Sequence, residues 1–226
     1  MSDEINRRIA QPAGAMAPMS HGPDTTRRDM LLLLQVAGAG LFSIAAGWAL
    51  VDSMNPSADV IAAGAPIDFD ISKLQPGQQV VILWRGSPIL VMQRPEAALK
   101  TLQDPKSIAL LSDPNSTVHQ QPDYAKNWHR SVRPDIGVMV GICTHLGCLP
   151  EYMPTPDPST PTANWPGGYF CPCHGSKYDL AGRVWSGVPA PYNLPVPPYH
   201  FPDDKTLRIG ENPTGQVFDL ASVVQM

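Results

Sequence analysis

An uninterrupted apolar run lies near the start of the chain, where residues 30–51 read MLLLLQVAGAGLFSIAAGWALV without a charged side chain. A helix of some twenty apolar residues is long enough to cross the ~30 Å hydrocarbon layer of a bilayer. The alternative, a helix buried in a soluble core, is disfavoured by the length of the run and its lack of charge. Residues 30–51 are therefore predicted to form a single transmembrane anchor.

Basic residues lie on one side of this run. Arginines precede it at Arg7, Arg8, Arg27 and Arg28, and no Lys or Arg follows before Lys73. The positive-inside rule then places the N-terminus in the cytoplasm and the bulk of the chain outside it. The pair at 27 and 28 is typical of a twin-arginine export signal, although two arginines that only set the topology would look the same.

Segments poor in apolar periodicity flank the anchor. Residues 1–24 are predicted to be disordered, and residues 1–29 to be a cytoplasmic tail that ends in the twin-arginine pair. Residues 52–66 (DSMNPSADVIAAGAP) are rich in small side chains and are predicted to be a flexible hinge, with a short helical extension as the alternative. The AGA triplet at 63–65 offers a cleavage site, but it lies well past the apolar run, so we expect the anchor to be retained.

Beyond Ile67 the pattern changes to short apolar and β-branched runs separated by Pro and Gly. Residues 78–94 predict a hairpin that turns at RGSP, and residues 135–143 predict a strand that delivers Cys143 at its end. Residues 94–103 predict a short helix with Pro95 in its first turn. Further strands are expected at YFC, KYDL, RVW, LPVPPYHF and TLRIG. The domain from 67 to 226 is therefore predicted to be all-β.

Composition and charge narrow the class of protein. The formal net charge of −4 over 226 residues provides no basic field for nucleic acid, so we expect no nucleic-acid partner. The 26 prolines cluster with glycines in the second half of the chain, which favours a small, loop-rich β domain.

Metal-binding chemistry is concentrated in two short stretches, CTHLGC at 143–148 and CPCHGS at 171–176, which hold all four cysteines and two of the six histidines. Thiolates with imidazoles select transition metals or iron–sulfur clusters. Two structural disulfides would leave the histidines without a purpose, and a Cys2His2 zinc site normally pairs Cys with Cys and His with His. A [2Fe–2S] cluster of Rieske type takes one Cys and one His from each stretch and leaves the other two cysteines as a pair.

The two motifs resemble the Rieske iron–sulfur subunit of bacterial cytochrome bc1 complexes, the ubiquinol–cytochrome c reductases. TTRRD, NPSADV and GVPAPYNLPVP resemble the same family, so the resemblance extends from about Thr25 to the end of the sequence. It implies an all-β Rieske domain, made of small antiparallel sheets with a cluster-binding subdomain, on a single N-terminal transmembrane helix. Residues 149–170, between the motifs, are long, polar and Pro-rich and are expected to be a surface insertion.

The resemblance implies a ligand set for one [2Fe–2S] cluster. Cys143 and Cys171 would bind the buried iron, and His145 and His174 the outer iron. Imidazole ligands make the cluster less negative than four thiolates would, so it accepts an electron more readily, and Rieske centres reach potentials of about −150 to +300 mV. His174 would also form a hydrogen bond with a quinol and accept its proton.

Further roles follow from the resemblance. Cys148 and Cys173 would form a disulfide between the two stretches, as an oxidising compartment permits. The hydroxyls of Ser176 and Tyr178 would donate to cluster or thiolate sulfur and raise the potential. Residues expected to shield the cluster from water are Leu146, Pro172 and, from the proline loop, Gly187, Pro189 and Pro191. His21, His119, His129 and His200 have no partner spacing and are given no role.

The resemblance implies an electron-transfer subunit of a respiratory chain. It would oxidise ubiquinol at a site formed with cytochrome b and pass the electron to cytochrome c1, within a dimeric complex of the bacterial inner membrane, with its Rieske domain in the periplasm. The alternative is the small Rieske subunit of an exported oxidase such as arsenite oxidase. A Rieske ferredoxin or ring-hydroxylating oxygenase is disfavoured by the extra cysteine pair and the anchor.

Overall fold

The computed structural model describes residues 26–57 and 64–225, and the chain divides into two units, 1–56 and 57–226. The predicted disorder of residues 1–24 lies outside the described residues. So does the central part of the predicted hinge, residues 58–63, including its alternative as a helical extension.

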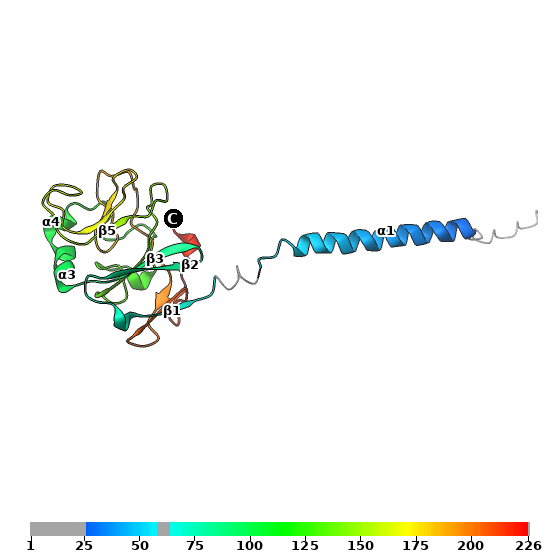
Figure 1. Cartoon of the computed structure of the whole chain (residues 1–226), viewed down its shortest axis with the longest axis horizontal. Coiled ribbons are helices and arrows are strands. Elements are labelled where there is room, and N and C mark those ends of the chain that lie inside the picture. The colour runs from blue at the N-terminus through cyan, green and yellow to red at the C-terminus, as the bar shows by residue number, and fades with distance from the viewer. Residues whose placement is uncertain (1–25, 58–63, 226) are drawn as a thin grey trace, which may run out of the picture. The chain divides into compact units, whose positions relative to one another are not determined.

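The first unit contains one long helix, α1 (Arg27–Asp52), which includes the whole predicted anchor (Figure 1). A capping box starts it, because the Asp29 N–H donates to Thr26 Oγ1 and the Thr26 N–H donates to the Asp29 carboxylate. Its 26 residues give a length of roughly 39 Å, enough for a bilayer core. Within the described residues, it is the one helix long and apolar enough to cross a membrane.

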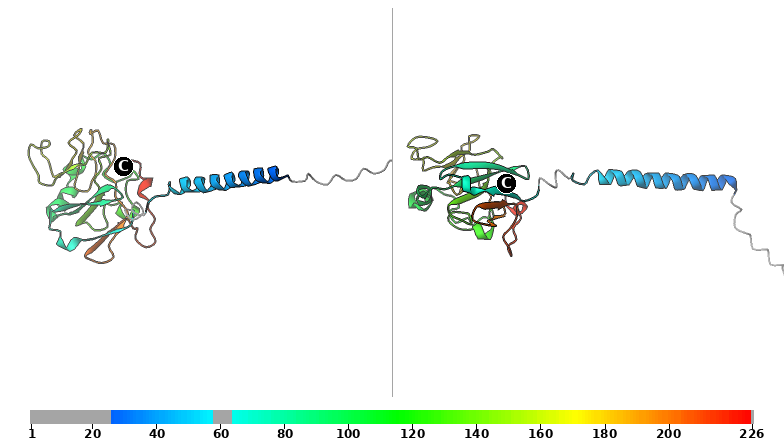
Figure 2. Two further views of the ribbon diagram at one scale, coloured as in Figure 1. Left: turned by 45° about the vertical axis from the view of Figure 1, so that its right-hand side comes forward. Right: turned by 60° about the horizontal axis from the view of Figure 1, so that its bottom comes forward.

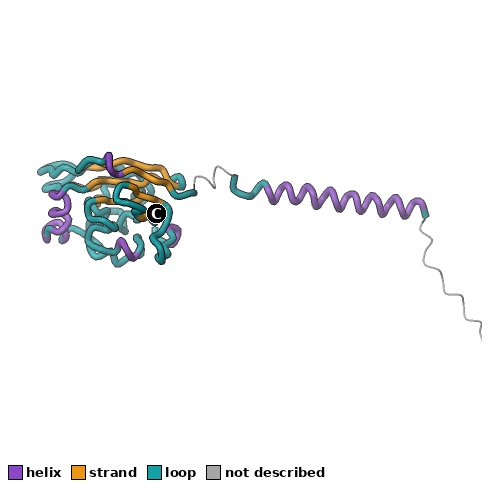
Figure 3. Tube along the Cα trace, turned by 90° about the horizontal axis from the view of Figure 1, so that it is seen from below, coloured by secondary structure: helices purple, strands orange, loops and turns teal. Residues whose placement is uncertain are grey.

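In its described residues, the second unit has three antiparallel sheets of three strands each. Most of the chain between the strands is loop, as Figure 3 shows. This confirms the predicted class of small antiparallel sheets. The first sheet has the order β1–β9–β8 (Ile67–Asp70, Thr206–Ile209, Tyr199–His200), the second β2–β3–β4 (Gln79–Trp84, Ser87–Gln93, Ile136–Val140) and the third β5–β6–β7 (Glu151–Met153, Gly168–Phe170, Lys177–Tyr178).

The second sheet separates two hydrophobic cores. Side chains alternate along a strand, so Ile89 and Val91 of β3 face the core shared with the first sheet, and Leu90 and Met92 face the core beneath the two Cys/His stretches. β4 is buried on both faces in the same way, which explains its continuous apolar sequence. The β2–β3 hairpin, seen from two sides in Figure 2, turns at Arg85 and Gly86, both with positive φ, as predicted for residues 78–94.

Helices are short in this unit. The predicted helix at 94–103 is α3 (Glu96–Gln103), but Pro95 is its N-cap, with extended backbone angles, rather than its first helical residue. Elsewhere in the described part of this unit, the helical elements are α4 (Pro105–Ile108), η1 (Ile71–Lys73), η2 (Asp123–Ala125) and η3 (Leu220–Ser222).

Two predicted strands are wrong or reduced. RVW forms only isolated bridges, because the Arg183 N–H donates to the Asp179 carboxylate and the Val184 N–H to the Asn193 side chain, which removes both donors from a ladder. LPVPPYHF is strand only at Tyr199–His200. Its prolines lack the N–H that a ladder needs.

The prediction of a surface insertion at 149–170 is wrong for both ends of that segment. β5 and β6 come from it and supply two of the three strands of the third sheet. Trp165 is buried, and its indole N–H donates to the Met153 carbonyl at 2.9 Å. Only the Pro-rich middle of the segment is largely exposed.

The C-terminal end of the predicted hinge is fixed to the domain. The Trp84 indole N–H donates to the Ala65 carbonyl at 3.0 Å, and Arg85 Nε donates to the Gly64 carbonyl at 3.4 Å. The Arg85 guanidinium also lies 4.6 Å from the centre of the Trp84 ring. The tip of the β2–β3 hairpin therefore holds residues 64 and 65.

Candidate metal centre

The two Cys/His stretches fold into loops with the same backbone hydrogen bonds. Loop 1 is residues 143–148, shortly after β4, and loop 2 is residues 171–176, between β6 and β7. In each loop the first N–H donates to the last carbonyl (2.8 Å), and the fifth N–H donates to the first carbonyl (2.9 Å). The fifth residues, Gly147 and Gly175, have φ of +84° and +77°, a region that favours glycine.

A disulfide between Cys148 and Cys173 joins the loops, with the two Cα atoms 6.7 Å apart, so the predicted bridge is confirmed. The sulfurs of Cys148, Cys171 and Cys173 lie within 4.8 Å of one another, but two of them are in the disulfide. Only Cys171 of this group offers a thiolate. The interpretation with two disulfides is wrong, because Cys143 and Cys171 are free.

The two free thiols meet beneath the loops. Cys143 and Cys171 are each 1% exposed and belong to the same hydrophobic core. Burial raises the pKa of the Cys171 thiol, and the Cys143 thiol beside it raises that pKa further. A metal cation favours the thiolate form of a cysteine, and two free thiols that lie together make the pair a natural holder for an iron ion.

The two candidate histidines lie together. The rings of His145 and His174 are 4.7 Å apart between centroids and nearly perpendicular (88°). His145 Nδ1 is buried and has no hydrogen-bond partner among the described residues, whereas the His174 side chain is exposed. A buried ring nitrogen without a partner is costly unless a metal binds it. The donor set of two thiols and two imidazoles therefore fits a cluster with mixed ligands.

Tyr178 supplies a hydroxyl to the inner thiol. Its oxygen lies 3.3 Å from Cys143 Sγ and accepts the Thr144 N–H at 3.2 Å. Thr144 Oγ1 donates its own proton to the Tyr192 carbonyl at 2.7 Å, so the Tyr178 proton is free to point at sulfur. Burial raises the pKa of Tyr178 far above neutrality, and the bond to Cys143 raises it too, so the phenol remains a donor.

Ser176 ends loop 2 and is fully buried. Its oxygen accepts the Ala190 N–H at 3.0 Å, which ties the loop to the proline-rich segment that follows. Because the oxygen is the acceptor in this bond, the hydroxyl proton is available to a sulfur atom.

The residues expected to shield the cluster lie at the surface. Leu146 is 71% exposed. The other candidates are exposed as well, namely Pro172, Gly187, Pro189 and Pro191. Thr144 was not singled out from the sequence, although it is fully buried and holds both Tyr178 and Tyr192. Thr144 lies between the candidate ligands Cys143 and His145, and this position is the sequence feature from which its role could have been predicted.

Comparisons with known proteins agree with this site. Residues 68–198 match the Rieske [2Fe–2S] domain. The chain is 48% identical over 207 residues to the ubiquinol–cytochrome c reductase iron–sulfur subunit of Allochromatium vinosum, covering 88% of this chain and 96% of the relative. The subunit of the same name from Bradyrhizobium diazoefficiens is 40% identical over 195 residues, which cover 86% of this chain and 100% of that one. A chain of a hyperthermophilic respiratory Complex III is 26% identical, with a TM-score of 0.43, and the match covers 77% of this chain and 97% of that one.

The fold and the two loops place the chain in the class of Rieske [2Fe–2S] proteins, because the domain match covers more than half of its length. Within that class, the chain belongs to the family of ubiquinol–cytochrome c reductase iron–sulfur subunits.

Proposed function

We propose that the chain is the electron-transfer subunit of a ubiquinol–cytochrome c reductase. Cys143 and Cys171 would hold the inner iron of a [2Fe–2S] cluster, and His145 and His174 the outer iron. When bound, this cluster supplies a one-electron acceptor of high potential. The observation that carries the proposal is the pairing of two buried thiols with two adjacent imidazoles, of which one is exposed.

The exposure of the His174 side chain supports its proposed contact with the substrate. A quinol gives up a proton with each electron, so the residue that receives it has to reach the quinol hydroxyl. His174 is exposed, whereas His145 is half-buried with one ring nitrogen enclosed. We therefore expect His174 to form the hydrogen bond with ubiquinol and to take its proton, while the buried thiols keep water from the inner iron.

The proposed setting is a bacterial inner membrane. Arg27 and Arg28 begin α1, so the tail before it would remain in the cytoplasm and the Rieske domain would lie in the periplasm. A domain that receives its cluster in the cytoplasm has to fold before export, which agrees with a twin-arginine signal at this pair. The expected partners are cytochrome b and cytochrome c1 in a dimeric complex.

The test is potentiometric EPR on membranes that contain the chain, together with purification through a tag on it. We expect a Rieske signal at high potential and co-purification with b- and c-type haems. An exported oxidase such as arsenite oxidase would instead yield the Rieske signal without the two haems. A preparation with haems but no Rieske signal would contradict the ligand set.

A hinge between anchor and domain is part of the proposal, because the cluster has to approach both a quinol and a c-type haem. The domain holds residue 65 through Trp84, so the moving segment would end before it. Two or three prolines between Ala58 and Ala62 should reduce quinol:cytochrome c activity at least about tenfold, because proline fixes φ. The EPR signal and midpoint potential should not change, and wild-type turnover in a fully assembled variant would show a passive spacer.

A further inference from the structure

Three buried arginines meet at one loop of the domain. Arg94, Arg130 and Arg183 are 3%, 1% and 2% exposed, although arginine is rarely buried unless it is paired. All three contact the backbone or side chains around residues 179–183, the loop that follows β7. The loop therefore collects three positive charges out of contact with water.

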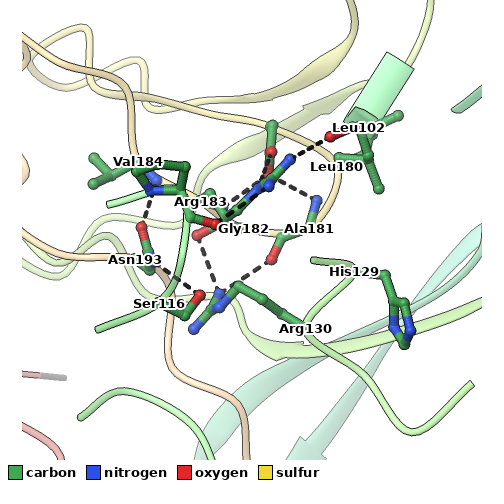
Figure 4. Close-up of polar contacts among 12 residues, drawn as sticks. Leu102, Ser116, His129, Arg130, Leu180, Ala181, Gly182, Arg183, Val184 and Asn193 are labelled. Carbon is green, nitrogen blue, oxygen red and sulfur yellow. Dashed lines mark hydrogen bonds and ion pairs between the residues drawn. The ribbon is translucent and has the colours of Figure 1, made fainter. Parts of the chain in front are cut away.

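Two of the guanidinium groups donate hydrogen bonds to backbone carbonyls of the loop. Arg94 Nε donates to the Leu180 carbonyl at 3.1 Å. Arg130 Nη1 donates to the carbonyls of Ala181 (3.1 Å) and Gly182 (3.3 Å), as Figure 4 shows. These carbonyl dipoles satisfy some of the donors, but they do not cancel the charge of either guanidinium.

One buried carboxylate faces the three cations. Asp179 Oδ2 accepts from Arg183 Nε at 2.6 Å, and both side chains are almost fully enclosed, so this pair is neutral. Arg94 and Arg130 form no ion pair with a described residue, and each keeps one buried nitrogen without a hydrogen-bond partner. These two cations are left uncompensated in the interior.

Neighbouring groups do not remove this charge at neutral pH. Burial lowers the pKa of Arg130 to about 9, so its guanidinium remains protonated. Burial and the charge of Arg94 lower the pKa of His129 to about 4, so that ring stays neutral and adds no charge. Asp113 also acts on Arg130, but its carboxylate accepts the N–H groups of Thr117 and Val118 and is partly exposed.

The two cations bind the segment of chain that directly follows Tyr178. Leu180 and Ala181, whose carbonyls they bind, follow Tyr178 by two and three residues, so at most about 11 Å of extended backbone separates them from it. Tyr178 touches Cys143 Sγ, and all of these residues except the arginines share one hydrophobic core. Charges in such a core are screened less than charges in water.

We propose that Arg94 and Arg130 raise the potential of the metal centre as uncompensated buried charges. Reduction adds one negative charge to the centre, and a nearby positive charge favours the reduced form. Asp179 opposes this effect, and Arg183 offsets Asp179. The inference rests on the proposed function, since it requires the cluster at Cys143, His145, Cys171 and His174.

Three substitutions in the full chain, measured by potentiometric EPR in membranes with the assembled complex, separate charge from structure. Arg130→Gln should lower the midpoint potential, and Arg130→Lys, which keeps the charge, should lower it less. Asp179→Asn keeps an acceptor for the loop N–H groups but removes the anion, so it should raise the potential. Arg208→Gln, at an exposed cation paired with Asp68, is the matched control and should leave the potential unchanged.

A purely structural role predicts a different result. Loosening the loop would displace the Tyr178 hydroxyl, so Arg130→Gln and Asp179→Asn would both lower the potential, and Arg130→Gln would add nothing to Tyr178→Phe. A through-space charge predicts opposite signs for the first two variants and additive shifts for the double variant. Equal potentials in the Arg130→Gln and Arg130→Lys variants, or a fall in Asp179→Asn, would overturn the proposal.

Two further measurements keep the test decisive. If Arg130→Gln does not assemble, Arg94→Gln and Arg94→Lys make the same comparison at the second cation. Absence of a Rieske signal in the wild-type membranes would defeat the proposed function itself. A normal wild-type signal with unmoved potentials in the variants would defeat only the inference about the arginines.

Discussion

Loops 1 and 2 share a backbone but are held in place differently. Both have the same pair of hydrogen bonds and a glycine with positive φ in the fifth position. Loop 1 is fixed from inside by Tyr178 and by the Thr144 bond to Tyr192, whereas loop 2 is fixed at its end by the bond between Ser176 and Ala190. The loops also differ in exposure, since the histidine of loop 1 is half-buried and that of loop 2 is exposed.

This difference suggests how one site can hold a metal and still meet a substrate. Equivalent backbones allow each loop to present one thiol and one imidazole, and the disulfide keeps the loops together. Unequal burial then leaves the imidazole of His174 more exposed than that of His145, as the proposed contact with a quinol requires. Substitutions made in matched pairs, one in each loop, can test both the equivalence and the difference.

The largest effect is expected for the proposed ligands. Cys143→Ser and Cys171→Ser should both abolish the Rieske EPR signal, as should His145→Gln and His174→Gln, because each removes a bond to iron. The loss should be complete in either loop, in spite of their different exposure. A normal signal in any one of these variants would remove that residue from the ligand set and break the equivalence of the loops.

The disulfide is the next largest contribution. Its cysteines are 25 residues apart, and opening a loop of this size removes about 3 kcal/mol of stability. Cys148→Ser and Cys173→Ser should lower the midpoint of denaturant unfolding equally, since they break the same bond. The double variant should be no worse than either single one. A clear difference between the two single variants would show a second role for one of the thiols.

The two loop glycines provide a smaller and closely matched comparison. Neither Gly147 nor Gly175 has an atom within 4 Å of a Cβ built on it, so alanine would meet only backbone strain. Each Gly→Ala change should therefore cost about 1–2 kcal/mol of unfolding free energy, by the same amount in both loops. Gly182→Ala is a contrasting control, because its Cβ would also press on Met139 Sδ at 3.0 Å. Unequal costs at 147 and 175 would show that the loops are not equivalent.

The sequence predicted the parts of the molecule that depend on local patterns. The long apolar helix, the β2–β3 hairpin and the strand before Cys143 follow from the apolar pattern of the sequence, and the disulfide follows from the family resemblance. The structure confirms all four. The strand expected at RVW failed because the side chains of Asp179 and Asn193, four and nine residues from their donors, accept its N–H groups.

What the sequence could not predict depends on long-range packing. The burial of Trp165 fixes one end of a Pro-rich segment that looks like a surface loop, and only the fold shows which strands it joins. Arg94 and Arg130 look like ordinary surface arginines in the sequence, since their acceptors include carbonyl groups on a loop roughly 50 or more residues away. Thr144 gives no sign of its bond to Tyr192 for the same reason.

The smallest expected effect is that of removing one hydroxyl, either that of Tyr178, which contacts loop 1, or that of Ser176, which ends loop 2. Tyr178→Phe removes the donor that faces Cys143 Sγ, and Ser176→Ala removes the buried hydroxyl whose proton is free beside loop 2. A net hydrogen bond of about 0.5–1.5 kcal/mol, lost from the reduced state, corresponds to a fall of roughly 20–60 mV in a one-electron potential. Potentiometric EPR should show such a fall in each variant with the signal retained, and quinol oxidation should slow in step.

The double variant that combines Tyr178→Phe with Ser176→Ala tests how independently the two loops act on the potential. Tyr178 and Ser176 have different hydrogen-bond partners, Cys143 and Thr144 for one and Ala190 for the other, so their effects should add when both are removed. Thr144→Val is the matched control, because it keeps the backbone N–H that Tyr178 accepts but loses the hydroxyl contacts with Tyr192 and Tyr178. Its potential should fall less than that of Tyr178→Phe. A double variant no lower than one single variant would mean that the loops act as one unit, and an unchanged potential in both single variants would mean that the hydroxyls point away from sulfur.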